Sequence, residues 1–306
     1  MRQETMDKNA TTLYIHIQMF DNYRIVAVTP AGRRRYLEIL IPQILALRPY
    51  IDEYRLWVNT TDAHDIAYME AVAAKYSDFI KLERLPQSVP VNGNLTIRHF
   101  FPQCCDPNTI YVRFDDDIVF IDSVSAFRDF LIFRIVNPHY FLVYANILNN
   151  AVTTHIHQCM GNLKPVNKEV ASFKAEDPIG WGSPQFAAGI HEQIIKEITK
   201  TNALTLHAFH WKTPWILYGA PRVSINCISW FGSQFAQFGG IIGHQDEEYW
   251  LSVIAPRELG RVNAIYGGFV VVHFAFCTQR ALLEETTDYL QQYKEYTVGK
   301  KYNRLL

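Results

Sequence analysis

The sequence has few of the features that mark membrane proteins or disulfide-rich secreted proteins. Its five cysteines include no CxxC pair and so indicate neither a disulfide framework nor a zinc knuckle. No hydrophobic run approaches the roughly 20 residues that cross a bilayer. The polar residues 1–12 lack the apolar core of a signal peptide. We therefore expect a cytoplasmic protein without a transmembrane segment, whose residues 1–12 are flexible.

The chain also has no large excess of positive or negative charge. The chain carries 29 Lys and Arg against 30 Asp and Glu, a formal net charge of -1. Its one dense basic run, at 33–35, is too short for a nucleic-acid track, so a small or neutral ligand is favoured over a nucleic acid. The 306 residues are 49% hydrophobic, which is enough to bury one large core. We expect a single domain spanning 1–306.

The first half of the chain alternates short β-branched runs with segments of helical apolar spacing. This pattern predicts strands at 24–29, 54–58, 79–85 and 109–114, and helices at 36–47 and 65–76. Such alternation indicates an α/β fold with a mostly parallel, twisted central sheet flanked by helices. We assign nucleotide binding to residues 13–150.

The second half is less regular. A helix at 123–135, capped by Asp122 or Ser123, and a strand at 140–145 come first. Residues 152–238 are rich in Gly, Pro, Trp and His, as in loops that build a pocket. The sequence then predicts a helix at 246–254, a strand at 268–273 and a final helix at 278–293. Residues 151–306 are the expected acceptor-binding and catalytic half.

Three consecutive carboxylates follow the strand at 109–114. Asp115, Asp116 and Asp117 lie between two hydrophobic runs, where unpaired negative charges are costly. Their oxygens suit Mn²⁺ or Mg²⁺, and such an ion can bridge a diphosphate while taking only one or two protein carboxylates. The alternative is an acidic turn that faces solvent or caps the next helix.

This motif, placed after the fourth strand of an α/β pattern, resembles the Asp-x-Asp motif of GT-A glycosyltransferases. The resemblance covers about residues 24–276. It implies that Asp117 binds the metal, that Asp115 lies near the ribose or a metal-bound water, and that Asp116 is oriented toward the donor sugar. It also implies a nucleotide-sugar donor and a GT-A type fold.

Two later segments fit the same resemblance. The segment 243–250 looks like the acidic motif that opens a late helix in inverting members, and implies a catalytic base at Glu247 or Asp246. His273 looks like the C-terminal histidine that completes the metal site. The alternatives are a charged helix start stabilised by the helix dipole and a satisfied histidine at a strand end.

Other residues are candidates for the donor and acceptor. Trp181 and other tryptophans of the irregular region can carry sugar rings or fill the core. Gly32 allows close backbone approach, and Arg33 can pair with phosphate. The full set of donor-binding candidates is Thr29, Pro30, Gly32, Arg33, Asn59, Thr60, Arg98, Asp115 and Asp116.

These observations predict a metal-dependent, inverting glycosyltransferase that moves a sugar from a nucleotide sugar, with UDP favoured, to a hydroxyl of a carbohydrate acceptor. Three rivals remain. A nucleotidyltransferase acting on sugar phosphates would be expected to carry an early Gly-rich loop with a lysine, which is not evident. A glycoside hydrolase would need no nucleotide loop. A noncatalytic carbohydrate-binding protein would keep the tryptophans without needing the acids.

Overall fold

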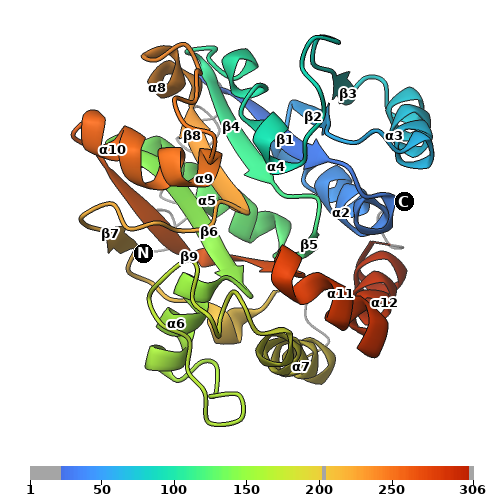
Figure 1. The fold of residues 1–306 in the computed structure, drawn as a ribbon, viewed down its shortest axis with the longest axis vertical. Helices are drawn as coiled ribbons and strands as arrows, with labels where there is room; N and C mark the ends of the chain where they lie inside the picture. The colour runs from blue at the N-terminus through green and yellow to red at the C-terminus, as the bar shows by residue number, and fades with distance from the viewer. Residues whose placement is uncertain (1–21, 202–204, 303–306) are drawn as a thin grey trace, which may run out of the picture.

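The computed structural model describes residues 22–201 and 205–302, so the expected flexibility of 1–12 lies outside the described residues. Within them the fold is mixed α/β, with a curled nine-stranded sheet flanked by helices (Figure 1). The strand order is β3-β2-β1-β4-β8-β6-β9-β5, and β7 pairs with β9. Among these residues no helix is long and apolar enough to cross a membrane.

The first half forms the parallel part of the sheet. Strands β2 and β4 pair in parallel on either side of β1, and β3 continues from β2. The helices between them cover the strands, as the alternating pattern predicts. The bounds are β1 Arg24–Ala31, α2 Arg34–Ala46, η1 Arg48–Tyr50, β2 Glu53–Val58, α3 Ala63–Lys75, β3 Ile80–Glu83, α4 Asn94–Ile97, η2 Phe101–Gln103 and β4 Thr109–Phe114.

The second half adds strands of both directions. Strands β6 and β9 run in the direction of β1 to β4, whereas β5, β7 and β8 run against it, so the sheet is mostly parallel. The bounds are β5 Ile118–Ile121, α5 Val124–Val136, β6 Tyr140–Leu148, α6 Ala151–Met160, α7 Pro184–Thr201, η3 His207–Phe209, β7 Trp215–Leu217, β8 Cys227–Phe231, α8 Gly232–Ala236, α9 Glu247–Tyr249, η4 Trp250–Ile254, α10 Ala255–Glu258, β9 Val262–His273, α11 Cys277–Thr286, α12 Tyr289–Lys294 and η5 Glu295–Tyr302.

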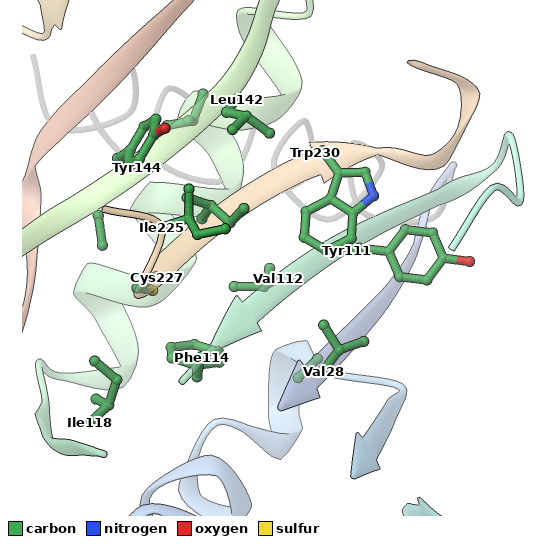
Figure 2. Packing of buried hydrophobic residues seen from close by; sticks show 14 of the residues in the cluster. Val28, Tyr111, Val112, Phe114, Ile118, Leu142, Tyr144, Ile225, Cys227 and Trp230 are labelled. Atoms are coloured by element: carbon green, nitrogen blue, oxygen red, sulfur yellow. The ribbon is translucent and has the colours of Figure 1, made fainter. Parts of the chain in front are cut away.

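Aromatic and aliphatic side chains join the two halves across the centre of the sheet. Tyr111 of β4 stacks on Trp230 of β8, with ring centroids 5.5 Å apart, and both side chains are buried (Figure 2). Trp230 stacks in turn on Phe235 of α8. A buried aromatic pair contributes about 0.5–1.5 kcal/mol beyond its area. The antiparallel strand β8 is therefore firmly attached to β4, whose end carries the acidic triplet.

Strand β9 separates two hydrophobic clusters. Val271 belongs to the main core, while Val270 and Val272 belong to a second cluster that includes Ile190 and Ile194 of α7. Alternate residues of a strand point to opposite faces, so β9 is buried on both sides. The last residue of β9, His273, is held in place by this packing.

The main deviations from the sequence expectations lie in the second half. The segment 152–238 is not mainly loop: it contains α7 and β8, and α6 begins one residue before it. The final helix is broken, because α11 ends at Thr286 and α12 starts at Tyr289. The predicted cap Ser123 is confirmed, since its hydroxyl accepts a hydrogen bond from the Ala126 N–H. Strand β1 continues through Pro30 to Ala31.

Candidate functional site

The acidic triplet forms the turn between β4 and β5. The Asp115 N–H donates to the Asn226 carbonyl just before β8 (2.8 Å), and the Phe274 N–H donates to the Asp117 carbonyl (2.8 Å). Ile118 pairs with His273 in the antiparallel register of β5 and β9. Two neighbouring strands thus fix the turn from either side, and the β9 register brings His273 to Asp117.

A cleft of about 560 Å³ lies over this turn. Seven carboxylate residues and four arginines line it, together with His273 and the aromatic side chains of Trp181 and Phe276. The charged residues are Asp115, Asp116, Asp117, Glu176, Asp246, Glu247, Glu248, Arg33, Arg113, Arg222 and Arg280. The cleft thus joins the predicted acidic turn, the predicted base and the predicted histidine.

Asp116 holds the loop that follows β1. Its carboxylate accepts hydrogen bonds from the Gly32 N–H (3.1 Å) and from both Nε and Nη2 of Arg33. A Cβ at Gly32 would lie 2.9 Å from the Asn59 carbonyl oxygen, so only glycine fits between these loops. In this structure, Asp116 therefore positions Gly32 and Arg33.

Asp117 contacts two arginines and one histidine. Its Oδ2 accepts from Nη2 of Arg33 (2.9 Å) and Nη2 of Arg280 (3.1 Å), and its Oδ1 lies 3.5 Å from Nε2 of His273. Burial alone would raise the pKa of Asp117, but Arg33, His273 and Arg280 together lower it well below its usual range. These contacts therefore favour the charged carboxylate form of Asp117.

The contacts of His273 bear on metal binding. Its Nδ1 donates to the carbonyl of Asn149 (3.1 Å), which leaves Nε2 with a lone pair in the neutral ring. That lone pair faces Oδ1 of Asp117, and both side chains are nearly completely buried. A proton or a cation must therefore lie between them: either the protonated ring donates to Asp117, which is the contact that helps to lower the pKa of Asp117, or a bound cation contacts both groups.

Asp117 and His273 thus fit a divalent cation as a pair of ligands, and Asp115 is the neighbouring carboxylate. Within 22–201 and 205–302, however, no three His, Cys, Asp or Glu side chains already form a metal-binding group. Arg33, Arg280 and Arg113 engage the other carboxylate oxygens. Ions such as Mn²⁺ or Mg²⁺ take one or two protein carboxylates and complete their shell with phosphate oxygens and water, so their binding by Asp117 and His273 stays a prediction.

Arg113, a buried arginine of β4, connects the acidic turn to the late helix. Its Nε donates to Asp115 Oδ1 and its Nη1 to Glu247 Oε1, both at 2.8 Å. The other oxygen of Asp115 accepts from the side-chain amide of Asn226 (3.1 Å). Burial, and the charge of Asp117, raise the pKa of Asp115 despite Arg113. Arg113 thereby fixes Glu247 relative to the turn.

The two candidate bases have different surroundings. Asp246 caps α9 through its Oδ1, which accepts from the Tyr249 N–H (2.9 Å), and its Oδ2 pairs with Arg222 (2.7 Å). Glu247 is 6% exposed, and its Oε2 has no hydrogen-bond partner among the described residues. Burial raises the pKa of Glu247 to about 7, although Arg113 opposes the shift. Glu247 therefore presents a free oxygen where Asp246 does not.

Arg222 organises the wall next to Glu247. It pairs with Glu176 (2.9 Å) and Glu248 (2.7 Å) as well as with Asp246. A single arginine shared by three carboxylates leaves this wall with an excess of negative charge. Carboxylates of this kind accept hydrogen bonds from sugar hydroxyls, while Trp181 supplies an aromatic surface nearby.

The predicted nucleotide residues are only partly brought together. Pro30 and Asn59 line the cleft, and the Asn59 side-chain amide donates to the Gly93 carbonyl (3.1 Å) while its Oδ1 is buried without a partner among the described residues. Thr29 is fully buried below the loop, where its hydroxyl accepts from Tyr54. Thr60 accepts from the Asp62 N–H.

Arg98 lies elsewhere, in a second hollow next to the cleft. Sequence reasoning missed five charged or polar contributors to the cleft that the structure shows: Arg113, Glu176, Arg222, Asn226 and Arg280. Arg113 alone had a sequence signal, a charged residue inside the apolar run 109–114. Of the tryptophans considered as sugar platforms, Trp181 lines the cleft and Trp230 is in the core.

Comparisons with known proteins find similarity only among solved structures. No family model and no curated protein sequence matches the chain. Among solved structures, the chain is similar to the crystal structure of mannose-1-phosphate geranyltransferase from Thermus thermophilus, with 16% identity and a TM-score of 0.29. The similarity covers 42% of this chain and 42% of that chain, so the chain spans less than half the length of the solved structure.

Proposed function

We propose that this protein is an inverting glycosyltransferase that binds a nucleoside diphosphate sugar, with UDP favoured, and transfers the sugar to a hydroxyl of a glycan. The observation that supports this most is the free, buried Oε2 of Glu247. Glu247 lines the same cleft as Asp117 and His273. A base and a diphosphate-metal site within one cleft are what inverting transfer requires.

The donor occupies the side of the cleft formed by the β1 loop and the start of α11. Arg33 and Arg280 are positioned to pair with phosphate oxygens, and the buried Nε of Arg280 has no partner among the described residues. The free Oδ1 of Asn59 can accept a hydrogen bond from a nucleobase N–H. When Mn²⁺ or Mg²⁺ is bound by Asp117 and His273, beside Asp115, it neutralises charge on the diphosphate.

The acceptor hydroxyl approaches Glu247. The Oε2 of Glu247 takes the hydroxyl proton while the acceptor oxygen forms a bond to the anomeric carbon and the bond from that carbon to the diphosphate breaks. The nucleoside diphosphate leaves with the bonding electron pair, and the configuration inverts. A base with a pKa of about 7 is matched to this step near neutral pH. Arg113 is a positioning residue, since it holds the other oxygen of Glu247.

Nucleotide binding is the first test. Thermal shift and calorimetry with UDP, GDP and ADP, each with Mn²⁺, with Mg²⁺ and with EDTA, should show metal-dependent stabilisation by at least one diphosphate. Slow hydrolysis of the corresponding nucleotide sugar without acceptor should follow. Stabilisation by free sugars alone would support a noncatalytic carbohydrate-binding protein instead.

A second assay separates the rival transferase. The protein is incubated with a nucleoside triphosphate and a sugar 1-phosphate, and pyrophosphate release is measured. A nucleotidyltransferase would release pyrophosphate, whereas a glycosyltransferase would release nucleoside diphosphate from the nucleotide sugar. Pyrophosphate release without any glycosyl transfer would reject our proposal in favour of a nucleotidyltransferase.

A further inference from the structure

A second hollow of about 610 Å³ lies beside the catalytic cleft. Residues just after α4 and the loop before α9 form it, with Arg98 on one side and Ile241 on the other. The loop is tightly docked: Gly240 has a φ of +68°, and a Cβ there would lie 2.5 Å from the Phe101 carbonyl oxygen. The hollow is therefore a built feature of the fold.

The lining combines cationic and apolar groups without any acid. Arg98 donates from Nε to Nε2 of His99 (3.3 Å), so that this histidine nitrogen is unprotonated. No carboxylate of the described residues pairs with the Arg98 guanidinium. Ile241 is 67% exposed and gives the hollow an apolar surface. An unpaired guanidinium next to apolar surface suits a ligand with an anionic group and a nonpolar face.

The hollow adjoins the cleft near Glu247. Gln245 lines both, and it precedes Glu247 by two residues. The charges of the two spaces differ. Acidic residues outnumber arginines in the cleft, whereas the described residues that line the hollow include Arg98 and no Asp or Glu. An anionic group of the acceptor is thus repelled from the cleft wall around Glu176 and Glu248 and attracted by Arg98.

We propose that this hollow is a distal acceptor subsite, in which Arg98 binds a carboxylate or phosphate on the part of the acceptor next to the reacting sugar. The inference rests on the proposed function, because it assigns the acceptor to the Glu247 side of the cleft. It also gives Arg98 a role in acceptor selection in place of nucleotide binding.

The test compares p-nitrophenyl glucuronide with p-nitrophenyl glucoside, which differ in one carboxylate and share an apolar ring. Dissociation constants are measured by NMR titration of the full chain without nucleotide. The glucuronide should bind about five- to tenfold more tightly, and added salt should reduce the preference. Arg98→Gln should abolish it and Arg98→Lys should keep part of it, while the control Arg128→Gln, which alters an exposed arginine outside both hollows, should leave it unchanged.

Affinity for UDP with Mn²⁺ is measured on the same variants. Wild-type nucleotide affinity in Arg98→Gln supports the acceptor role, whereas a large loss would place Arg98 in the donor site and overturn the inference. Equal binding of the two glycosides by wild type, or a preference that survives Arg98→Gln, would overturn it as well. If no nucleotide binds but the Arg98-dependent preference remains, the proposed function fails while the anion site stands.

Discussion

Replacement of Glu247 by glutamine tests the proposed base most directly. Glutamine has nearly the same shape, and its Oε1 can still accept the hydrogen bond from Arg113, so the cleft should keep its form. The variant lacks the negative charge and the basic carboxylate oxygen that take the acceptor proton. Donor binding should change little, because Glu247 is hydrogen-bonded to Arg113 rather than to Arg33 or Arg280, the arginines proposed to bind the diphosphate.

The size of the effect follows from the chemistry. General base catalysis contributes about 10²- to 10⁴-fold to rate, or roughly 3 to 5 kcal/mol of barrier. We therefore expect kcat of Glu247→Gln to fall by about that factor. Below its pKa of about 7 the wild-type base is increasingly protonated, so the wild-type rate should rise with pH and level off above about 7. The variant should lose this dependence.

The assay follows nucleoside diphosphate release from the nucleotide sugar, with acceptor present, between pH 5 and 9. Asp246→Asn is the matched control: asparagine also caps helices well, so α9 is preserved while the neighbouring charge is removed. Near-wild-type turnover in Glu247→Gln, with a large loss in Asp246→Asn, would refute the assignment and make Asp246 the base. An unchanged pH profile in Glu247→Gln would also contradict it.

The remaining predictions concern the metal, the loop, the product and stability. Asp117→Asn should weaken Mn²⁺-dependent binding of nucleoside diphosphate at least about tenfold by calorimetry, whereas the exposed control Asp129→Asn should not; equal affinities would count against a metal ligand. His273→Ala should shift the Mn²⁺ requirement less strongly, since Asp117 remains; an unchanged metal titration argues against ligation. Gly32→Ala should lower nucleotide affinity, because the Cβ of the alanine would lie too close to the Asn59 carbonyl oxygen and displace the loop. Unchanged affinity would show that the loop accommodates the added methyl group without loss of binding. NMR of the product should show an inverted anomeric centre, and a retained one removes the reason for a base at Glu247. Burial raises the folded-state pKa of Glu247, so the stability that this group contributes is complete below about pH 4.5 and is lost as pH rises through about 7. Over this range the melting temperature of Glu247→Gln should fall less than that of the wild type, by the equivalent of at most about 3 kcal/mol. Parallel plots of melting temperature against pH for the two proteins would contradict this.

The sequence by itself determined the main strands and helices of the first half and the place of the acidic turn. Short β-branched runs such as 109–114 predict buried strands, and the ends of parallel strands meet at one edge of a sheet. Asp115, Asp116, Asp117, Glu247 and His273 were all expected near one site, and they line one cleft. Their roles in metal binding and catalysis remain predictions.

Helix α7 shows why the middle of the chain was harder. Its apolar residues Phe186, Ile190, Ile194 and Ile198 recur every four residues, but the glycine at 189 and the surrounding Gly and Pro obscure the pattern. A Cβ at Gly189 would lie 2.4 Å from Cγ1 of Val166, so this glycine reflects tertiary packing rather than a loop. Local pattern alone cannot separate these two reasons for a glycine.

Only the tertiary structure decided which charged groups meet. Arg33 and Arg280 reach Asp117 from positions 84 and 163 residues away in the sequence, and Arg113 reaches Glu247 across 134 residues. The antiparallel strand β8 brings Asn226 to Asp115, which an alternating strand-helix pattern does not predict. The hydrogen bonds of Asp246 likewise depend on its contacts with the α9 backbone and with Arg222. Periodicity records which residues are buried, whereas the partner of a buried charge is set by chain segments far apart in sequence.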